Sequence, residues 1–174
     1  MSTAIEMMMA EHRVIESVLA SLAEFVRTPD ATPAKLAEYV EFFVAYSDTL
    51  HHAKEEDILF EMLVEHGMSR DSGPVGCMML EHGSNRALVG QLREASEREQ
   101  WSQDDRDQVT NVAEQFVSLL GNHIKKEDNV LYPLAMSMLP EAAVGALDDR
   151  CASWDANDDQ RVKLEQLATT LTQR

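Results

Sequence analysis

The stretch HHAKEEDILF, residues 51–60, contains two histidines, each followed four residues later by a glutamate. A similar stretch, HIKKEDNVLY, occupies residues 123–132 and contains one histidine. Aligning His51 with His123 matches both the glutamates and the apolar residues that follow them, whereas aligning His52 with His123 places an isoleucine opposite an asparagine. The repeat therefore selects His51, rather than its neighbour, as the counterpart of His123.

A second repeat supports a duplication of the chain. MMAEH at residues 8–12 recurs as MMLEH at residues 78–82. Each half thus contains a segment with one such histidine, followed by a segment with a histidine and a glutamate four residues apart. This order is typical of a duplicated helical hairpin.

Apolar residues recur every three or four positions in four long segments, and this spacing predicts helices. Pro33 suits a first helical position with Thr32 as its cap, and Pro133 should bend the end of the last segment. The remaining sequence has weaker periodicity and predicts one or two short helices packed on the bundle. The expected helices cover residues 4–27, 33–66, 74–99 and 104–138, and the expected domains are a helical bundle at 1–138 and a helical extension at 139–174.

The helical face around His51 is apolar and includes Phe43, Val44 and Ile58. The face around His52 is more polar. Because the apolar face of a bundle helix should line the core, this pattern also favours His51 as the inward residue. His52 and Glu56 are then expected beside the site, turned toward a neighbouring helix or solvent.

The composition excludes several classes of protein. The chain has 15 Lys and Arg against 31 Asp and Glu, a formal charge of -16, which would repel nucleic acid and anionic membranes. It shows neither a secretory signal nor an 18-residue apolar run, and its two cysteines suggest neither a disulfide framework nor a thiolate zinc site. We expect a soluble cytoplasmic protein, monomeric or homodimeric, with no nucleic acid or membrane partner.

The predicted bundle would bury four histidines and two glutamates, one histidine or one histidine–glutamate pair per helix. Burying so many titratable groups is costly unless they bind a cation. Six ligands exceed the needs of one tetrahedral zinc ion, whereas two metal ions bridged by both carboxylates would use all of them. Imidazole and carboxylate suit iron, manganese or zinc. The candidate metal ligands are His12, His51, Glu55, His82, His123 and Glu127.

The motifs AEHRVIESVL, YSDTLHHAKEEDILF, GPVGCMMLEH and HIKKEDNVLYPL occur in this order over residues 4–138. Together they resemble the hemerythrin-like HHE cation-binding domain. The resemblance implies an up-down-up-down four-helix bundle around two non-haem iron ions with oxo or hydroxo and carboxylate bridges. Carried over motif by motif, it implies the same six ligands. His82 is followed four residues later by Arg86 rather than histidine, which places the chain nearer the bacterial members with four histidines and two glutamates than the oxygen carriers.

These observations lead to three functional hypotheses. In the first, the di-iron centre binds O2, NO or peroxide, for sensing or detoxification. If the protein is an enzyme, it would then be an oxidoreductase of the peroxidase, catalase or NO- or O2-reducing type. In the second, the bundle stores or senses iron without turnover. In the third, it is an interaction module whose histidines are incidental.

Overall fold

A computed structural model describes residues 2–154 and 158–173, and these residues form helices and short connections, without any strand. The all-helical fold class predicted from the sequence is confirmed. No described helix is long and apolar enough to cross a membrane. The elements are α1 (Thr3–Phe25), α2 (Pro33–Phe42), η1 (Phe43–His52), η2 (Glu55–Phe60), α3 (Glu61–Glu65), α4 (Gly73–Ser96), α5 (Gln103–Lys126), η3 (Glu127–Leu131), α6 (Tyr132–Met138), α7 (Glu141–Trp154) and α8 (Asp158–Thr172).

Local sequence explains where the long helices begin. The side chain of Ser2 accepts a hydrogen bond from the backbone of Ile5, and Thr32 caps α2 in the same way, directly before Pro33. Ser102 and Asp105 form a reciprocal capping box at the start of α5. These caps satisfy backbone N–H groups that have no partner within their own helix.

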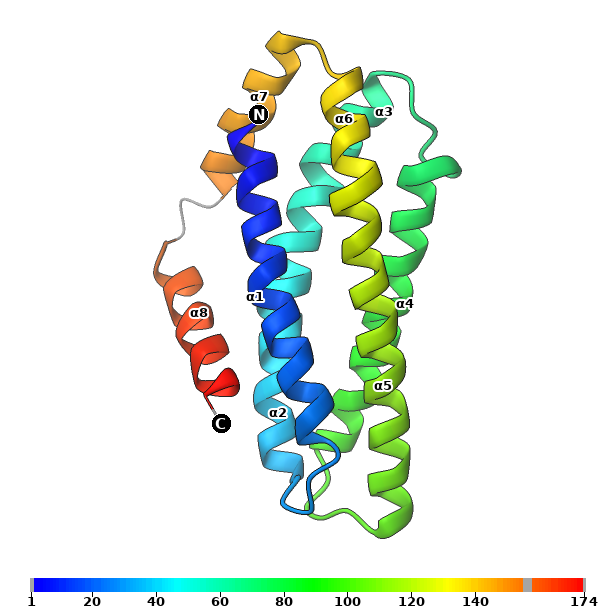
Figure 1. The fold of residues 1–174 in the computed structure, drawn as a ribbon, viewed down its shortest axis with the longest axis vertical. Helices are drawn as coiled ribbons and strands as arrows, with labels where there is room; N and C mark the ends of the chain where they lie inside the picture. Colours follow the sequence, from blue (N-terminus) through cyan, green and yellow to red (C-terminus); the bar gives the residue numbers. More distant parts are fainter. Residues whose placement is uncertain (1, 155–157, 174) are drawn as a thin grey trace.

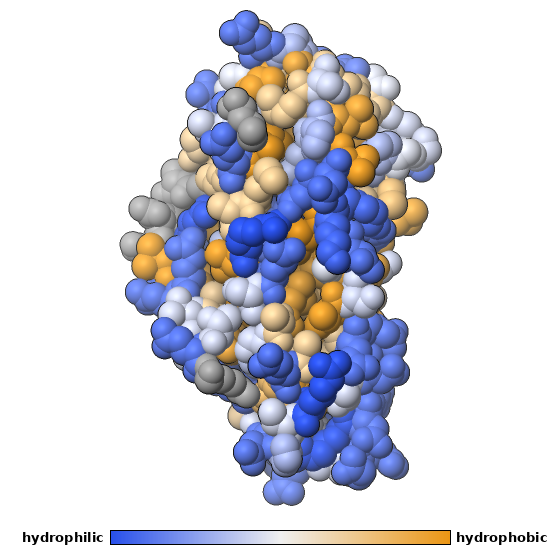
Figure 2. Space-filling view, viewed as in Figure 1, coloured by the Kyte–Doolittle hydropathy of each residue, from blue (hydrophilic) through white to orange (hydrophobic). Residues whose placement is uncertain are grey.

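Four helical rods form the bundle and alternate in direction along the chain (Figure 1). The rod that begins with α2 packs against α4, and α5 packs against both α1 and α4. Hydrophilic residues cover much of the outer surface in the view of Figure 2, with apolar residues visible between them. This arrangement is the up-down-up-down four-helix bundle that the resemblance implied.

The core consists of two apolar clusters separated by a polar layer. On α1, Ile5 and Met8 belong to one cluster and Ile15 and Leu22 to the other, with buried His12 between them. The other three rods follow the same order: apolar, then polar, then apolar. The fold therefore encloses a set of polar side chains at mid-height, surrounded by apolar residues above and below.

The backbone adopts π-helical turns at both histidine–glutamate motifs. The segments η1 and η2 include His51, His52 and Glu55, and η3 begins at Glu127. The sequence predicted uninterrupted α-helices here, because apolar periodicity does not distinguish the two kinds of turn. The helix also continues through Pro133, which lies in the first turn of α6 directly after η3. The π-helical turns at the two motifs are of a kind that occurs often at functional sites.

The C-terminal helices α7 and α8 lie along one side of the bundle, beside α1 (Figure 1). The side chain of Asp148 accepts a hydrogen bond from the backbone N–H of Ala4 at 2.9 Å. The carbonyl of Leu171 accepts one from Ser21 at 2.6 Å. Leu147 and Leu171 are fully buried, so both helices contribute to the core.

Candidate metal centre

All six predicted ligands lie together in the polar layer. Every rod contributes one or two of them, and all six residues are 0% exposed to solvent. They are His12 on α1, His51 on η1, Glu55 on η2, His82 on α4, His123 on α5 and Glu127 on η3.

The four imidazoles form two close pairs. The Nε2 atoms of His12 and His51 are 2.8 Å apart, and those of His82 and His123 are 3.0 Å apart. In each pair the two nitrogen atoms face a common point from different helices. Two imidazole nitrogens arranged in this way can share a proton or bind one metal ion.

The two carboxylates lie between the imidazole pairs. Glu127 approaches both: Oε2 is 3.2 Å from Nε2 of His12, and Oε1 is 3.0 Å from Nε2 of His123. Glu55 Oε2 is 3.7 Å from Nε2 of His51 and 3.5 Å from Nε2 of His82. Each carboxylate is therefore placed to bridge two ions.

Three of these carboxylate oxygens have no hydrogen-bond partner among the described residues. They are Oε2 of Glu55 and both oxygens of Glu127. A buried carboxylate oxygen without a partner is costly, and a cation removes that cost. The residues present therefore fit a metal centre.

The geometry divides the candidate ligands into two groups of four. His12 and His51 form one group with the two glutamates, and His82 and His123 form the other with the same glutamates. Within each group the ligand atoms lie within 4.8 Å of one another. Because Glu55 and Glu127 belong to both groups, the arrangement fits two carboxylate-bridged ions rather than one.

A second set of carboxylates fixes the orientation of the imidazoles. Each histidine has its Nδ1 next to a carboxylate oxygen, so Nδ1–H can donate outward while Nε2 faces the centre. Such hydrogen bonds also make an imidazole a stronger metal ligand. The pairs are His12 with Asp128 at 2.7 Å, His51 with Glu11 at 2.8 Å, His82 with Glu56 at 2.6 Å and His123 with Glu81 at 3.0 Å.

Each of these four carboxylates also contacts a cationic side chain. Lys54, which is fully buried, donates to Glu11 at 2.6 Å, and Arg161 of α8 donates to the same oxygen at 3.0 Å. Burial would raise the pKa of Glu11, but His51 and Lys54 lower it to about 2, so this carboxylate stays ionised. The remaining pairs are Arg86 with Glu56, Lys126 with Glu81 and Arg13 with Asp128.

The centre binds protons when no cation is present. Burial lowers the pKa of His51 to about 4, with help from the charge of His12. Burial alone would also lower the pKa of His12, but Asp128 and Glu127 raise it to about 9. A proton on His12 therefore occupies the space between the two Nε2 atoms that the geometry offers to a cation.

The two central glutamates, Glu55 and Glu127, also have pKa values shifted in opposite directions. Burial raises the pKa of Glu55 well above its usual value, and the charge of Glu127 adds to this effect. Burial opposes the ionisation of Glu127, but three histidines, His123 first, hold its pKa well below the usual value. Without a cation, Glu55 is thus the protonated member of the pair.

The sequence interpretation did not identify three of the outer carboxylates: Glu11, Glu81 and Asp128. The signal was present in the repeats, because a glutamate directly precedes both His12 and His82, and an acidic residue directly follows both motif glutamates. Glu56, which we expected beside the site, holds Nδ1 of His82.

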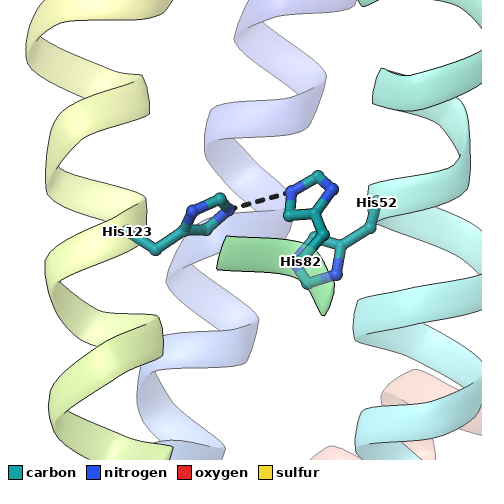
Figure 3. A group of neighbouring side chains, drawn as sticks. All are labelled: His52, His82 and His123. Carbon is teal, nitrogen blue, oxygen red and sulfur yellow. Dashed lines mark hydrogen bonds between the residues drawn. The ribbon is translucent and has the colours of Figure 1, made fainter. Parts of the chain in front are cut away.

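His52 lies beside the centre, where the sequence interpretation expected it. Its side chain is buried, and its ring stacks on that of His82 with 4.0 Å between centroids (Figure 3). Nitrogen atoms of His52, His82 and His123 lie within 4.8 Å of one another. Of the two orientations that we expected, toward a neighbouring helix or toward solvent, the structure shows the first, because His82 lies on α4.

The aromatic residues on the two sides of the centre differ. The ring of Tyr132 stacks on His12, and its hydroxyl donates to Oε1 of Glu55 at 2.7 Å. At the equivalent position of the other motif, Phe60 stacks on His82 but has no hydroxyl. Only the Tyr132 side can therefore supply a tyrosine O–H group to a central carboxylate.

Replacing Tyr132 with Phe is expected to leave the fold and the amount of bound metal unchanged but to weaken metal binding by about two- to tenfold, the effect of one hydrogen bond. The reason is that Glu55 loses the donor that orients it. Competition titration with a chelator measures this change. Tyr39→Phe is the matched control, because the Tyr39 hydroxyl pairs with Ser21, away from the centre. Equal affinity in both variants would contradict the prediction.

Comparison with known protein families gives a single result. A family model described as the Hemerythrin HHE cation binding domain matches residues 3–135, which include every candidate ligand. No curated protein and no solved structure matches the chain.

Proposed function

The chain belongs to the Hemerythrin HHE cation-binding family, and from this membership we propose that it binds two iron ions and uses them to bind O2, NO or peroxide. The biological role would be sensing or detoxification of that molecule. The main support is the pair of four-residue ligand groups that share Glu55 and Glu127.

Each metal position would receive two imidazole nitrogens and one oxygen from each shared carboxylate. Iron ions bound there would supply redox chemistry and coordination positions for a small ligand. The protein residues hold the ligand atoms in place: the outer carboxylates fix each imidazole, and Tyr132 orients Glu55. The apolar clusters on both sides keep bulk water away from the centre.

The hypothesis of incidental histidines is disfavoured by the outer carboxylates. A surface or core histidine needs one hydrogen-bond partner, but here all four have Nδ1 against a carboxylate and Nε2 against another imidazole. Such uniform orientation of four side chains is expected of metal ligands.

A second candidate function is an iron-storing or iron-responsive module without turnover. One contact favours it: Arg161 of α8 donates to Glu11, which holds His51. Occupancy of the centre could then be linked to the packing of the C-terminal helices, and through them to a partner protein or a second copy of the chain.

The test begins with the purified protein loaded with ferrous iron without oxygen. Metal analysis should give about two irons per chain, as the two ligand groups require. Exposure to air, NO and hydrogen peroxide should then change the visible spectrum. A change with repeated consumption of the added molecule supports detoxification, and a change without consumption supports sensing. Failure to bind iron, or an iron-loaded protein that responds to none of the three, would contradict the proposal.

A further inference from the structure

His52 is a buried histidine that the six-ligand centre does not use. It directly follows the candidate ligand His51 and is 2% exposed. Neither of its ring nitrogens has a hydrogen-bond partner among the residues that the structure describes, and neither reaches solvent. Because buried polar groups are nearly always satisfied, two such nitrogens on one ring point to a partner that the protein chain does not itself supply.

The ring of His52 lies against one half of the centre. It stacks on His82 with 4.0 Å between centroids and stands edge to face with His123 at 5.5 Å (Figure 3). One nitrogen from each of these three histidines lies within 4.8 Å of the other two. Metal–nitrogen bonds are about 2.1 Å long, so nitrogens on one ion lie up to about 4.2 Å apart. Small movements of the rings therefore allow all three histidines to bind the same ion.

The surroundings of His52 resemble those of the four candidate histidine ligands. Each of the four has its Nδ1 next to a carboxylate oxygen and its Nε2 turned toward the centre. Nδ1 of His52 lies 3.5 Å from Oδ1 of Asp48, which precedes it by four residues, although the two atoms form no hydrogen bond. A carboxylate beside Nδ1 leaves Nε2 as the nitrogen that can bind a metal ion.

Arg86 connects the carboxylate beside His52 to the carboxylate that orients His82. Its Nε donates to Asp48 and its Nη2 donates to Glu56, both at 2.7 Å. Glu56 in turn lies 2.6 Å from Nδ1 of His82. One guanidinium group thus holds the carboxylates of both stacked histidines, as expected if the two rings are oriented for a common purpose.

Metal binding requires the ring of His52 to turn. Its plane is 18° from that of His82, and stacked rings direct their lone pairs side by side rather than at one point. The turn breaks no hydrogen bond with a described residue, because neither nitrogen of His52 has one. A rotation about the side-chain bonds therefore costs the stacking contact alone, and a metal–nitrogen bond replaces it.

We propose that His52 is a third imidazole ligand of the ion held by His82 and His123. The inference rests on the proposed function and adds a ligand to the six that the family implies. The ion at His82 and His123 would then have three imidazole ligands, whereas the ion at His12 and His51 would have two. The two positions would therefore differ in affinity, with the three-imidazole position binding the metal more tightly.

The test compares the wild type with His52→Phe, which keeps an aromatic ring against His82 but removes both nitrogens. Ferrous iron is titrated without oxygen in competition with a chelator. His52→Phe should bind one of the two ions at least about tenfold more weakly, because losing a ligand costs at least as much as losing a residue that orients one. His66→Phe is the matched control: His66 is exposed, its Nδ1 contacts the carbonyl of Met62, and its loss should leave both affinities unchanged.

Two further measurements separate metal binding from packing. Replacing two unpartnered buried nitrogens of His52 with carbon should not lower the thermal midpoint of the metal-free protein, so weaker iron binding at an unchanged midpoint reports the lost ligand. Nitrogen NMR of isotope-labelled histidine in the zinc-loaded wild type gives a direct readout. One ring nitrogen of His52 should shift with zinc, as those of His82 and His123 should.

The proposal is overturned if His52→Phe binds both ions as tightly as His66→Phe does. It is also overturned if zinc shifts the ring nitrogens of His82 and His123 but leaves those of His52 unchanged. Either result would mean that His52 only packs against the centre, with a buried water satisfying its nitrogens. Failure of the proposed function is distinguishable, because the wild type itself would then bind no iron or would respond to none of air, NO and peroxide.

Discussion

Glu127→Gln is expected to reduce bound metal from about two ions per chain to fewer than one. Glu127 is the carboxylate closest to both imidazole pairs, with oxygen atoms 3.2 Å from Nε2 of His12 and 3.0 Å from Nε2 of His123. Glutamine keeps the shape of the side chain but removes the charge and replaces one ligand oxygen with an NH2 group, which is not a ligand for these metals. Metal analysis after gel filtration measures the result.

Glu55→Gln should lower the metal content in the same way, because Glu55 is shared by both ligand groups. Both variants should fold, because glutamine keeps the shape of the side chain and the two apolar clusters on either side of the centre are unchanged. Glu65→Gln is the matched control: it changes one exposed glutamate on α3 and should leave the metal content unchanged. Two ions per chain in both Glu127→Gln and Glu55→Gln would show that these carboxylates do not hold the metal.

The fold and the inner residues of the centre could be read from the sequence because both depend on patterns within single helices. Apolar periodicity indicated the helices, and the internal repeat indicated which histidine of the doubled pair matches His123. Residues four apart share a helix face whatever the neighbouring helix does. The six candidate ligands therefore followed from local spacing, and the structure places them in one layer.

The outer carboxylates could not be read in this way, because each hydrogen bond crosses between helices. Glu11 on α1 holds His51 on η1, and Asp128 on η3 holds His12 on α1. Which carboxylate faces which imidazole depends on the rotation of each helix about its axis, and periodicity fixes that rotation only roughly. A repeated Glu–His pair in a sequence is nevertheless a signal for such an arrangement.

The sequence left open whether His52 faces a neighbouring helix or solvent, for a related physical reason. The sequence interpretation used the angular step of an α-helix, which separates the faces of adjacent residues. In η1 the turns are π-helical, with more residues per turn, so adjacent residues lie closer in direction. His51 and His52 can then both be buried, one against His12 and one against His82.

Removing the metal is expected to lower the thermal midpoint of unfolding by about 8–16 °C. A ligand present at about a thousand times its dissociation constant stabilises the folded state by about 4 kcal/mol. For a chain of this size each kcal/mol corresponds to about 2–4 °C. In the metal-free protein, the paired imidazoles and the two central glutamates face one another without the cation that offsets their burial. Differential scanning calorimetry of chelator-treated and metal-loaded protein measures the shift.

Glu127→Gln supplies the control, because a variant that does not bind metal should unfold at the same temperature with and without added iron. The metal-free double variant with Glu55→Gln and Glu127→Gln should be less stable than the metal-free wild type, because the ionised Glu127 that it lacks is stabilised by three neighbouring histidines. The same double variant should lose all stabilisation by iron. A wild-type midpoint that does not depend on metal, or an equal shift in wild type and Glu127→Gln, would mean that the polar layer is held together by its own hydrogen bonds. The buried carboxylates would then have a structural role, with the outer ion pairs stabilising them in place of a cation.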